Sequence, residues 1–263
     1  MSMLGHYSLL FEKLGLVKTK KLTFDARGYA ERAAAGVAHP LESSRDICPP
    51  WWPTYPNLPN WDYDLVRLKP NKLRGCIHVG AWDCAELGCY VPLFGKNVVW
   101  VEANPHTYGR ITEPRASVYG HRAFNVALSD VDEKEVVLNI MPQADSSSIY
   151  ECVGASPTEK IKLQTKTLDT LIAEEEIDMD NHNFLNIDAE GAEFDVLEGM
   201  KNNLHKIDYL FLEASLYERH RGAKNFKQLH EYVTDKGFKL FQYSDSFKTL
   251  KWGDVFYVRD ASE

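Results

Sequence analysis

The sequence predicts a doubly wound α/β fold built on a mostly parallel sheet. Three segments carry this prediction. Each is a short apolar run that ends in a glycine or a carboxylate and then becomes a helix: residues 77–86 (IHVGAWDCAE), 98–105 (VVWVEANP) and 184–199 (FLNIDAEGAEFDVLEG). A glycine after one strand and an acid at the end of the next, about twenty residues on, is typical of sheets that bind a ribose-bearing cofactor at their carboxyl edge.

Length and composition fit one large α/β domain with an extension. Of the 263 residues, 44% are apolar and 26% are charged, which is ordinary for a protein with a buried core. The net charge of −8 argues against nucleic acid or an anionic membrane as the main partner. No apolar run approaches a membrane span, and the first residues lack a signal-peptide pattern. The five cysteines form no CxxC pair or zinc-type cluster, so we expect reduced thiols and a cytoplasmic location.

The chain divides near residue 72 into an N-terminal extension, residues 1–72, and the α/β domain, residues 73–263. Apolar spacing in the extension predicts short helices near 10–14 and 24–38. Residues 48–64 (CPPWWPTYPNLPNWDYD) are crowded with proline and aromatic side chains, so we expect an extended strap that packs on the domain. The strap is either a structural wrap or a wall of the substrate pocket.

Strands and helices alternate in the first half of the domain. The strand at 76–79 leads into a helix with apolar residues at i, i+3, i+4 and i+7, which Gly95 ends. A strand at 98–102, a helix near 105–111 and a strand ending at 124–128 follow. This alternation predicts βαβ units and a parallel sheet.

The second half of the domain begins with an interruption. Residues 135–141 and 160–166 read as a β-hairpin around a turn of serines at 146–148. The alternation then resumes as a helix from Thr167, a strand at 184–188, a helix with Val196, Met200 and Leu204 on its buried side, a strand at 209–213, a helix at 225–236, and two runs at 239–243 and 254–259. The last two runs are so close in sequence that they can only pair antiparallel.

Parallel strands that finish in an antiparallel hairpin are typical of the Rossmann-like class I methyltransferase fold. On its motifs, the chain resembles the FkbM family of S-adenosylmethionine-dependent methyltransferases over roughly residues 74–260. The matching pieces are, in order, HVGAWDCAE, VEANP, NVALSD, the serine turn, TKTLDTLI, FLNIDAEGAEFDVLEG, YLFLEAS and WGDVFYVR. IDAEGAE followed by VLEG is the most specific of them.

The resemblance implies S-adenosyl-L-methionine as the cofactor and O-methylation of a sugar, a glycan or a secondary metabolite. From the residues themselves, Gly80 lets its backbone lie against a cofactor, and Glu102 offers two oxygens to the ribose hydroxyls. The resemblance adds further cofactor-binding positions: His78, Ala81, Ala103, Asn104, Val126, Ala127 and Asp188. Two positions depart from the family pattern, since His78 stands where an aspartate is usual and Cys84 where a second glycine is usual.

Candidate catalytic residues follow the fourth and fifth strands of the alternation. Asp188, Glu190 and Glu213 lie at or just beyond strand ends, where open α/β sheets bind ligands. Methyl transfer to a hydroxyl needs the acceptor oxygen at attack distance and its proton removed. We therefore expect catalytic roles for these acids and for His220, an imidazole in the next loop. The same carboxylates could hold a hard divalent cation, whereas Glu193 reads as a helix-start charge.

Two other classes of function stay open. An NAD-dependent oxidoreductase uses the same spacing of glycine and acid, but GAWDCAE lacks the GxGxxG series and the C-terminal hairpin is of the methyltransferase type. A catalytically inactive methyltransferase fold would serve as an interaction module, and His78 and Cys84 are compatible with it. The favoured hypothesis is an enzyme with a small-molecule or glycan acceptor.

Overall fold

The computed structural model describes residues 73–142, 146–244, 247 and 250–259. The N-terminal extension, with its expected helices and strap, lies outside the described residues. Within them, no helix is both long and apolar enough to cross a membrane.

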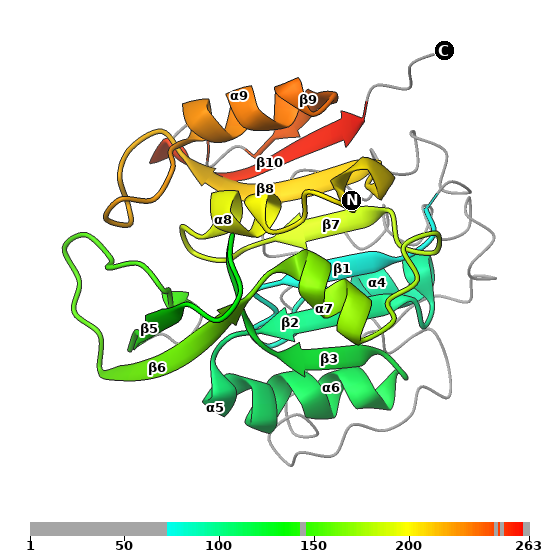
Figure 1. The fold of residues 1–263 in the computed structure, drawn as a ribbon, viewed down its shortest axis with the longest axis horizontal. Coiled ribbons are helices and arrows are strands. Elements are labelled where there is room, and N and C mark those ends of the chain that lie inside the picture. Colours follow the sequence, from blue (N-terminus) through cyan, green and yellow to red (C-terminus); the bar gives the residue numbers. More distant parts are fainter. Residues whose placement is uncertain (1–72, 143–145, 245–246, 248–249, 260–263) are drawn as a thin grey trace, which may run out of the picture.

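A seven-stranded sheet forms the centre of the domain (Figure 1). Its order is β3-β2-β1-β7-β8-β10-β9, and β10 runs antiparallel to both of its neighbours while the other pairs are parallel. The strands are β1 (Cys76–Val79), β2 (Val98–Glu102), β3 (Arg122–Asn125), β7 (Phe184–Ile187), β8 (Tyr209–Ser215), β9 (Phe238–Tyr243) and β10 (Trp252–Arg259). The predicted parallel sheet with a C-terminal antiparallel hairpin is confirmed.

Helices cover both faces of this sheet. On one face, α4 (Leu87–Phe94) and α6 (Glu113–Val118) contribute buried side chains to a shared core, and on the other face α7 (Leu168–Glu174), α8 (Glu193–Glu198) and α9 (Phe226–Asp235) do so. Successive strand residues point to opposite faces, so Ile77 and Val79 pack toward α7–α9 while Cys76 packs toward α4. Burial on both faces explains why the strands read as continuous apolar runs.

The expected helix ends have local causes. Thr167 caps α7, because its hydroxyl oxygen accepts the N–H of Thr170 at 3.1 Å. Asn225 and Gln228 form the capping box of α9, with reciprocal bonds of 3.1 and 3.2 Å. Gly95 follows α4 with φ +60° and donates its N–H to the carbonyl of Val91, as a C-terminal glycine does.

The helix expected near 105–111 differs from the prediction. It is three joined pieces: α5 (Pro105–Thr107), a π-helical turn η4 (Tyr108–Thr112) and α6. Pro114 explains the wide turn, because it has no N–H for the carbonyl of Arg110. The N–H of Glu113 instead reaches back five residues to the carbonyl of Tyr108.

The predicted hairpin forms a small second sheet beside the cleft edge. β5 (Glu135–Ile140) pairs antiparallel with β6 (Glu159–Lys166), and β4 (Ala127–Leu128) pairs with β6 on its other side. The single strand expected to end at 124–128 was therefore wrong, since β3 belongs to the main sheet and β4 to the small one. Asn125 marks the change, because its side chain donates to the carbonyls of Glu102 and Ala103.

Candidate active site

A cleft of about 570 Å³, open to solvent at its mouth, lies at the carboxyl edge of the main sheet. It is lined by the ends of β1 and β2, by residues 126–128 and 147–149, and by residues 188–190 and 192. Gly80, Glu102, Ala103, Val126, Ala127, Asp188 and Glu190, all expected site residues, line it.

Glu102 stands at the end of β2 and is nearly buried, with 8% of its surface exposed. One carboxylate oxygen accepts the N–H of Trp82 and the other accepts the N–H of Asn104, both at 2.7 Å. Burial raises the pKa of Glu102, while the N–H donors of Asn104 and Trp82 act in the opposite direction. The carboxylate thus ties together the two loops that follow β1 and β2.

Gly80 lines the cleft, and the packing of the strand ends gives a further reason for a glycine at this position. A Cβ at this position would lie 1.7 Å from the carbonyl oxygen of Asp188, and the backbone has φ +83°. Its N–H already donates to the carbonyl of Val101, as does that of Ala81. The glycine therefore lets the ends of β1 and β7 approach each other, and Ala81 is buried against the α4 side of the sheet.

His78 is not among the residues that line the cleft. Its ring is 2% exposed and faces α4, where Nδ1 lies 3.1 Å from the hydroxyl of Tyr90 and 3.3 Å from the amide nitrogen of Asn186. Burial lowers the pKa of His78 to about 3, so the ring is neutral at physiological pH. The carboxyl group of Glu86 lies 3.7 Å from Nδ1, and burial raises the pKa of Glu86 to about 8. The structure thus places His78 in a buried polar cluster, outside the lining of the cleft.

Asn104 also lies outside this lining. Its side-chain oxygen accepts the N–H groups of His106 and Thr107, at 3.0 and 3.4 Å, and so caps α5. The sequence Asn-Pro before a helix is a recognisable signal for this role. The role is structural in the described geometry.

The expected catalytic acids come together at the carboxyl ends of β7 and β8. Asp188, Glu190 and Glu213 each direct a carboxylate oxygen to one place, and these oxygens all lie within 4.8 Å of one another. Asp188 keeps an exposed surface even though it lies deep in the concave edge of the sheet. Desolvation there, followed by the charges of Glu213 and Glu190, raises the pKa of Asp188 well above its ordinary value.

Arg219 is the site residue that the sequence analysis missed. Its guanidinium lies 2.9 Å from a carboxylate oxygen of Glu213 and 3.5 Å from one of Glu190, and it stacks on Trp252 with 3.8 Å to the ring centre. Burial lowers the pKa of Arg219, but the charges of Glu213 and Glu190 outweigh this effect and raise it overall. Arg219, which directly precedes His220 in the sequence, thus supplies a cation among the three acids.

His220 is buried, at 3% exposed, with Nε2 3.6 Å from Glu190. Desolvation, followed by the charge of Arg219, lowers the pKa of His220 to about 4. The ring is therefore neutral near pH 7 and can accept a hydrogen bond. It packs against Gly191, where a Cβ would lie 2.9 Å from that of His220.

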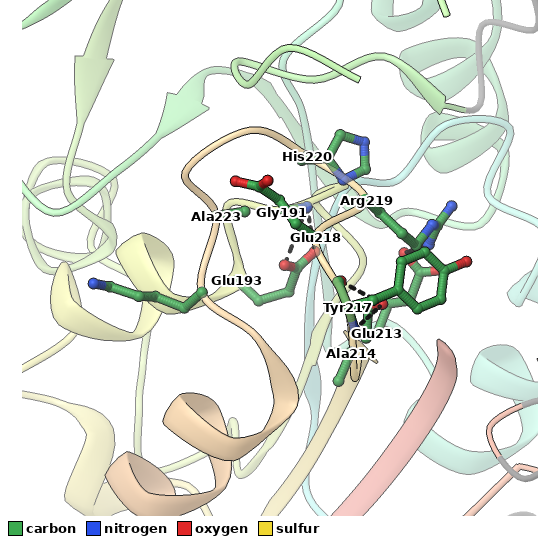
Figure 2. A pocket seen from close by; sticks show the side chains of 11 residues that line it. Gly191, Glu193, Glu213, Ala214, Tyr217, Glu218, Arg219, His220 and Ala223 are labelled. Atoms are coloured by element: carbon green, nitrogen blue, oxygen red, sulfur yellow. Dashed lines mark hydrogen bonds and ion pairs between the residues drawn. The ribbon is translucent and has the colours of Figure 1, made fainter. Parts of the chain in front are cut away.

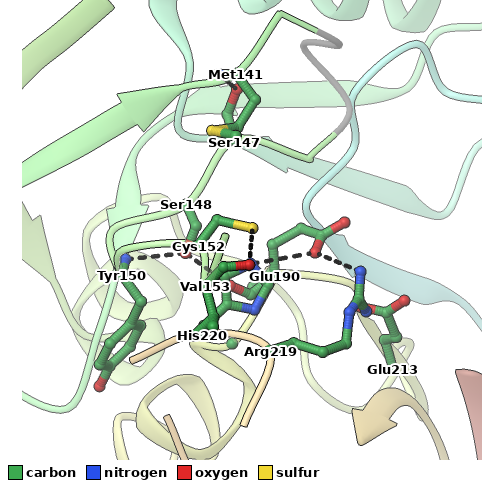
Figure 3. A network of polar contacts seen from close by, with 12 residues as sticks. Met141, Ser147, Ser148, Tyr150, Cys152, Val153, Glu190, Glu213, Arg219 and His220 are labelled. Carbon is green, nitrogen blue, oxygen red and sulfur yellow. Dashed lines mark hydrogen bonds and ion pairs between the residues drawn. The ribbon is translucent and has the colours of Figure 1, made fainter. Parts of the chain in front are cut away.

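The turn after β7 is held from both sides, as Figure 3 shows. Ser148 donates its hydroxyl to the carbonyl of Glu190 at 2.6 Å, from the loop of the small sheet. Residues 151–153 pair with residues 219–221 through two backbone hydrogen bonds of 2.8 Å. The N–H of Val153 donates to the carbonyl of Arg219, and the N–H of Arg221 donates to the carbonyl of Glu151. The hairpin insertion and the loop after β8 therefore position the acids together.

Glu193, expected to be a helix-start charge, stabilises the same turn. Its carboxylate accepts the N–H groups of Ala189 and Gly191 at 3.1 and 3.0 Å. Burial, then the charge of Glu213, raises the pKa of Glu193 to about 7. A second hollow opens beside it, lined in part by Glu213, Tyr217 and Arg219 (Figure 2).

The three acids also offer oxygen ligands of the kind that hard divalent cations prefer. Arg219 already pairs with Glu190 and Glu213 in this arrangement. A metal would have to compete with the guanidinium for these oxygens. Metal binding therefore stays a prediction.

The strand order, with β10 antiparallel between β8 and β9, and the cleft at the carboxyl edge define a class I methyltransferase fold. The sequence model described as "Methyltransferase FkbM domain" matches residues 77–240, and the chain belongs to this family. No curated protein sequence matches the chain. Two solved structures are similar: the methyltransferase domain of bacterial CtHen1-CN, at 10% identity over 76% of this chain and 96% of that one with a TM-score of 0.41, and a putative RNA methyltransferase from Pyrococcus horikoshii, at 9% identity over 76% and 84% with a TM-score of 0.34.

Proposed function

We propose that the protein is an S-adenosylmethionine-dependent O-methyltransferase whose acceptor is a hydroxyl of a sugar, a glycan or a secondary metabolite. The observation that carries the proposal is one cleft with Glu102 at the end of β2 and Asp188 at the end of β7. A ribose-binding acid and a proton-accepting acid are then placed in the same cleft on neighbouring parts of the sheet.

The residues fit a nucleoside-bearing cofactor by their chemistry. The backbone N–H groups of Trp82, Asn104 and Ala103 occupy part of the Glu102 carboxylate, which has about four acceptor sites, so at least one site is left for a ribose hydroxyl. Ala103, Val126 and Ala127 provide an apolar lining suited to a flat base. When bound, S-adenosylmethionine supplies an electrophilic methyl group on a sulfonium.

Asp188 is the residue that we assign to the acceptor proton. Its pKa is raised, so its carboxylate has a greater affinity for a proton than an ordinary aspartate. A hydroxyl bound against it gives its proton to the Asp188 carboxylate as the oxygen gains the methyl group, and the proton then leaves to water. Glu190 and Glu213 hold this acid in a negatively charged setting.

Acceptor preference follows from the second hollow. Tyr217 lies there with 50% of its surface exposed, and aromatic rings suit the apolar faces of sugars. The lining also offers hydrogen-bond acceptors at Glu213 and Glu218 and donors at Arg219 and Lys224, and hydroxyl groups can bond to both kinds. A polyhydroxylated acceptor therefore fits the chemistry of this hollow.

Calorimetric titration separates the proposal from its alternatives. S-adenosylhomocysteine should bind the purified full-length protein and NAD should not. Transfer of a labelled methyl group to a panel of neutral glycosides should then be detectable. Binding of NAD alone would indicate an oxidoreductase, and binding of neither would indicate an inactive interaction module.

A further inference from the structure

Arg219 is the cation in the described part of the chain that pairs with two of the three clustered acids. Its guanidinium reaches Glu213 at 2.9 Å and Glu190 at 3.5 Å with different nitrogens, Nη1 and Nη2. The stack on Trp252 of β10 and the carbonyl bond to Val153 fix the residue from two further directions. Only 22% of the side chain is exposed, so solvent screens these pairs weakly.

We propose that Arg219 is a positioning residue of the transfer site, which holds the carboxylates of Glu213 and Glu190 in place as anions beside Asp188. This inference rests on the proposed function. It assigns to Arg219 a task that a stacked structural arginine would not have. The planar fork of a guanidinium suits the task, because it bonds two oxygens at fixed angles.

The physical argument concerns where the proton goes. Three carboxylates this close cannot all stay ionised without a compensating charge. Because Arg219 bonds Glu213 and Glu190, the negative charge is fixed on those two acids, and their field makes the Asp188 carboxylate the one that accepts a proton most readily from a bound hydroxyl. Other titratable groups also face the cluster, and they add no second cation at neutral pH: Glu193 from α8, Asp254 from β10, and Tyr217 and His220 from the loop after β8.

The first test needs no cofactor and measures thermal stability against pH. In Arg219→Gln, the acids lose their cation and repel one another only when ionised. The Tm deficit relative to wild type should therefore grow between pH 5 and pH 8 by about 4–8 °C, which corresponds to a pKa rise of about one and a half units in one acid. Arg219→Lys keeps the charge, so its deficit should change little with pH.

Arg259→Gln is the matched control. Arg259 also stacks on an aromatic ring, Phe238 at 4.2 Å, but donates to the backbone carbonyls of Ile207, Leu204 and Lys236. Its Tm deficit should be independent of pH. A pH-independent deficit in Arg219→Gln as well would overturn the proposal. If Arg219→Gln is unfolded at pH 8, folding at pH 5 supports the proposal, and an unfolded protein at both pH values overturns it.

The second test measures methyl transfer. In Arg219→Gln, the acidic limb of the plot of kcat/KM against pH should shift to higher pH by about one unit or more, because an arginine beside an acid lowers the pKa of that acid by about that much. Arg219→Lys should return the limb toward wild type, and S-adenosylhomocysteine affinity should stay within about threefold in both. An unmoved limb would overturn the positioning role. If wild type binds no S-adenosylhomocysteine, the proposed function fails by itself, and the stability comparison still decides the charge placement.

Discussion

Glu102 is the residue on which the cofactor half of the proposal depends. In Glu102→Ala, the N–H groups of Trp82 and Asn104 each lose a charged acceptor at 2.7 Å. Each such bond contributes ~1.5–3 kcal/mol, and the desolvation of a buried carboxylate offsets part of this. We expect a net loss of about 2 kcal/mol in the free energy of unfolding, which for a domain of this size is about 4–8 °C in Tm. Loss of the ribose acceptors should weaken S-adenosylhomocysteine binding by about 10- to 100-fold.

Two measurements separate anchoring from binding. Differential scanning fluorimetry gives the Tm, and calorimetry well below that Tm gives the affinity of the folded molecules. Glu102→Gln, which keeps one acceptor oxygen, should be intermediate in both, and Glu113→Gln, at an exposed acid of α6, should change neither. Wild-type affinity in folded Glu102→Ala would remove Glu102 from the cofactor site, and an unchanged Tm would refute the anchoring of the two loops.

Three further predictions concern the acids and the turn after β7. Asp188→Asn should lower methyl transfer by about 100-fold or more and leave the Tm unchanged or raised, since it removes repulsion from the cluster; retained turnover would exclude Asp188 as the base. Burial raises the pKa of Glu86 to about 8 and those of Glu193 and Asp254 to about 7. An acid whose pKa is higher in the folded than in the unfolded protein stabilises the fold fully at pH values below its unfolded pKa, and this stabilisation is lost as the pH rises through the folded pKa. The wild-type Tm should therefore fall from about pH 5 to about pH 8.5. A rise would contradict those pKa values. Ser148→Ala removes the 2.6 Å bond to the turn and should cost about 1 kcal/mol, or about 2–4 °C in Tm; no change would mean that the hairpin does not support the turn.

The architecture could be predicted because its signals are local. Apolar runs of strand length, Gly95 after a helix and the Asn225–Gln228 capping box each depend on a few neighbouring residues. The direction of the C-terminal pair followed from the shortness of its connection. By contrast, the split between β3 and β4 depends on Asn125 bonding carbonyls after β2, over twenty residues away, and no local pattern reports that contact.

The site was only partly predictable for the same reason. Glu102, Asp188, Glu190 and Glu213 stand at strand ends, so topology alone brings them to one edge of the sheet. Arg219 has its partners on a different strand and a different turn, and LYERHRG contains no spacing that selects it. The orientation of His78 was equally hidden, because a strand buried on both faces does not reveal which of its residues face the ligand edge.

Gly80 has a consequence for how variation in such a chain should be interpreted. The oxygen of Asp188 occupies the place where any Cβ at position 80 would lie, so even alanine, the smallest replacement, forces β1 and β7 apart. In a survey of all substitutions, position 80 will therefore be as intolerant as a residue that touches substrate. Its intolerance reports the spacing of two neighbouring strand ends, and a ligand need not be invoked to explain it.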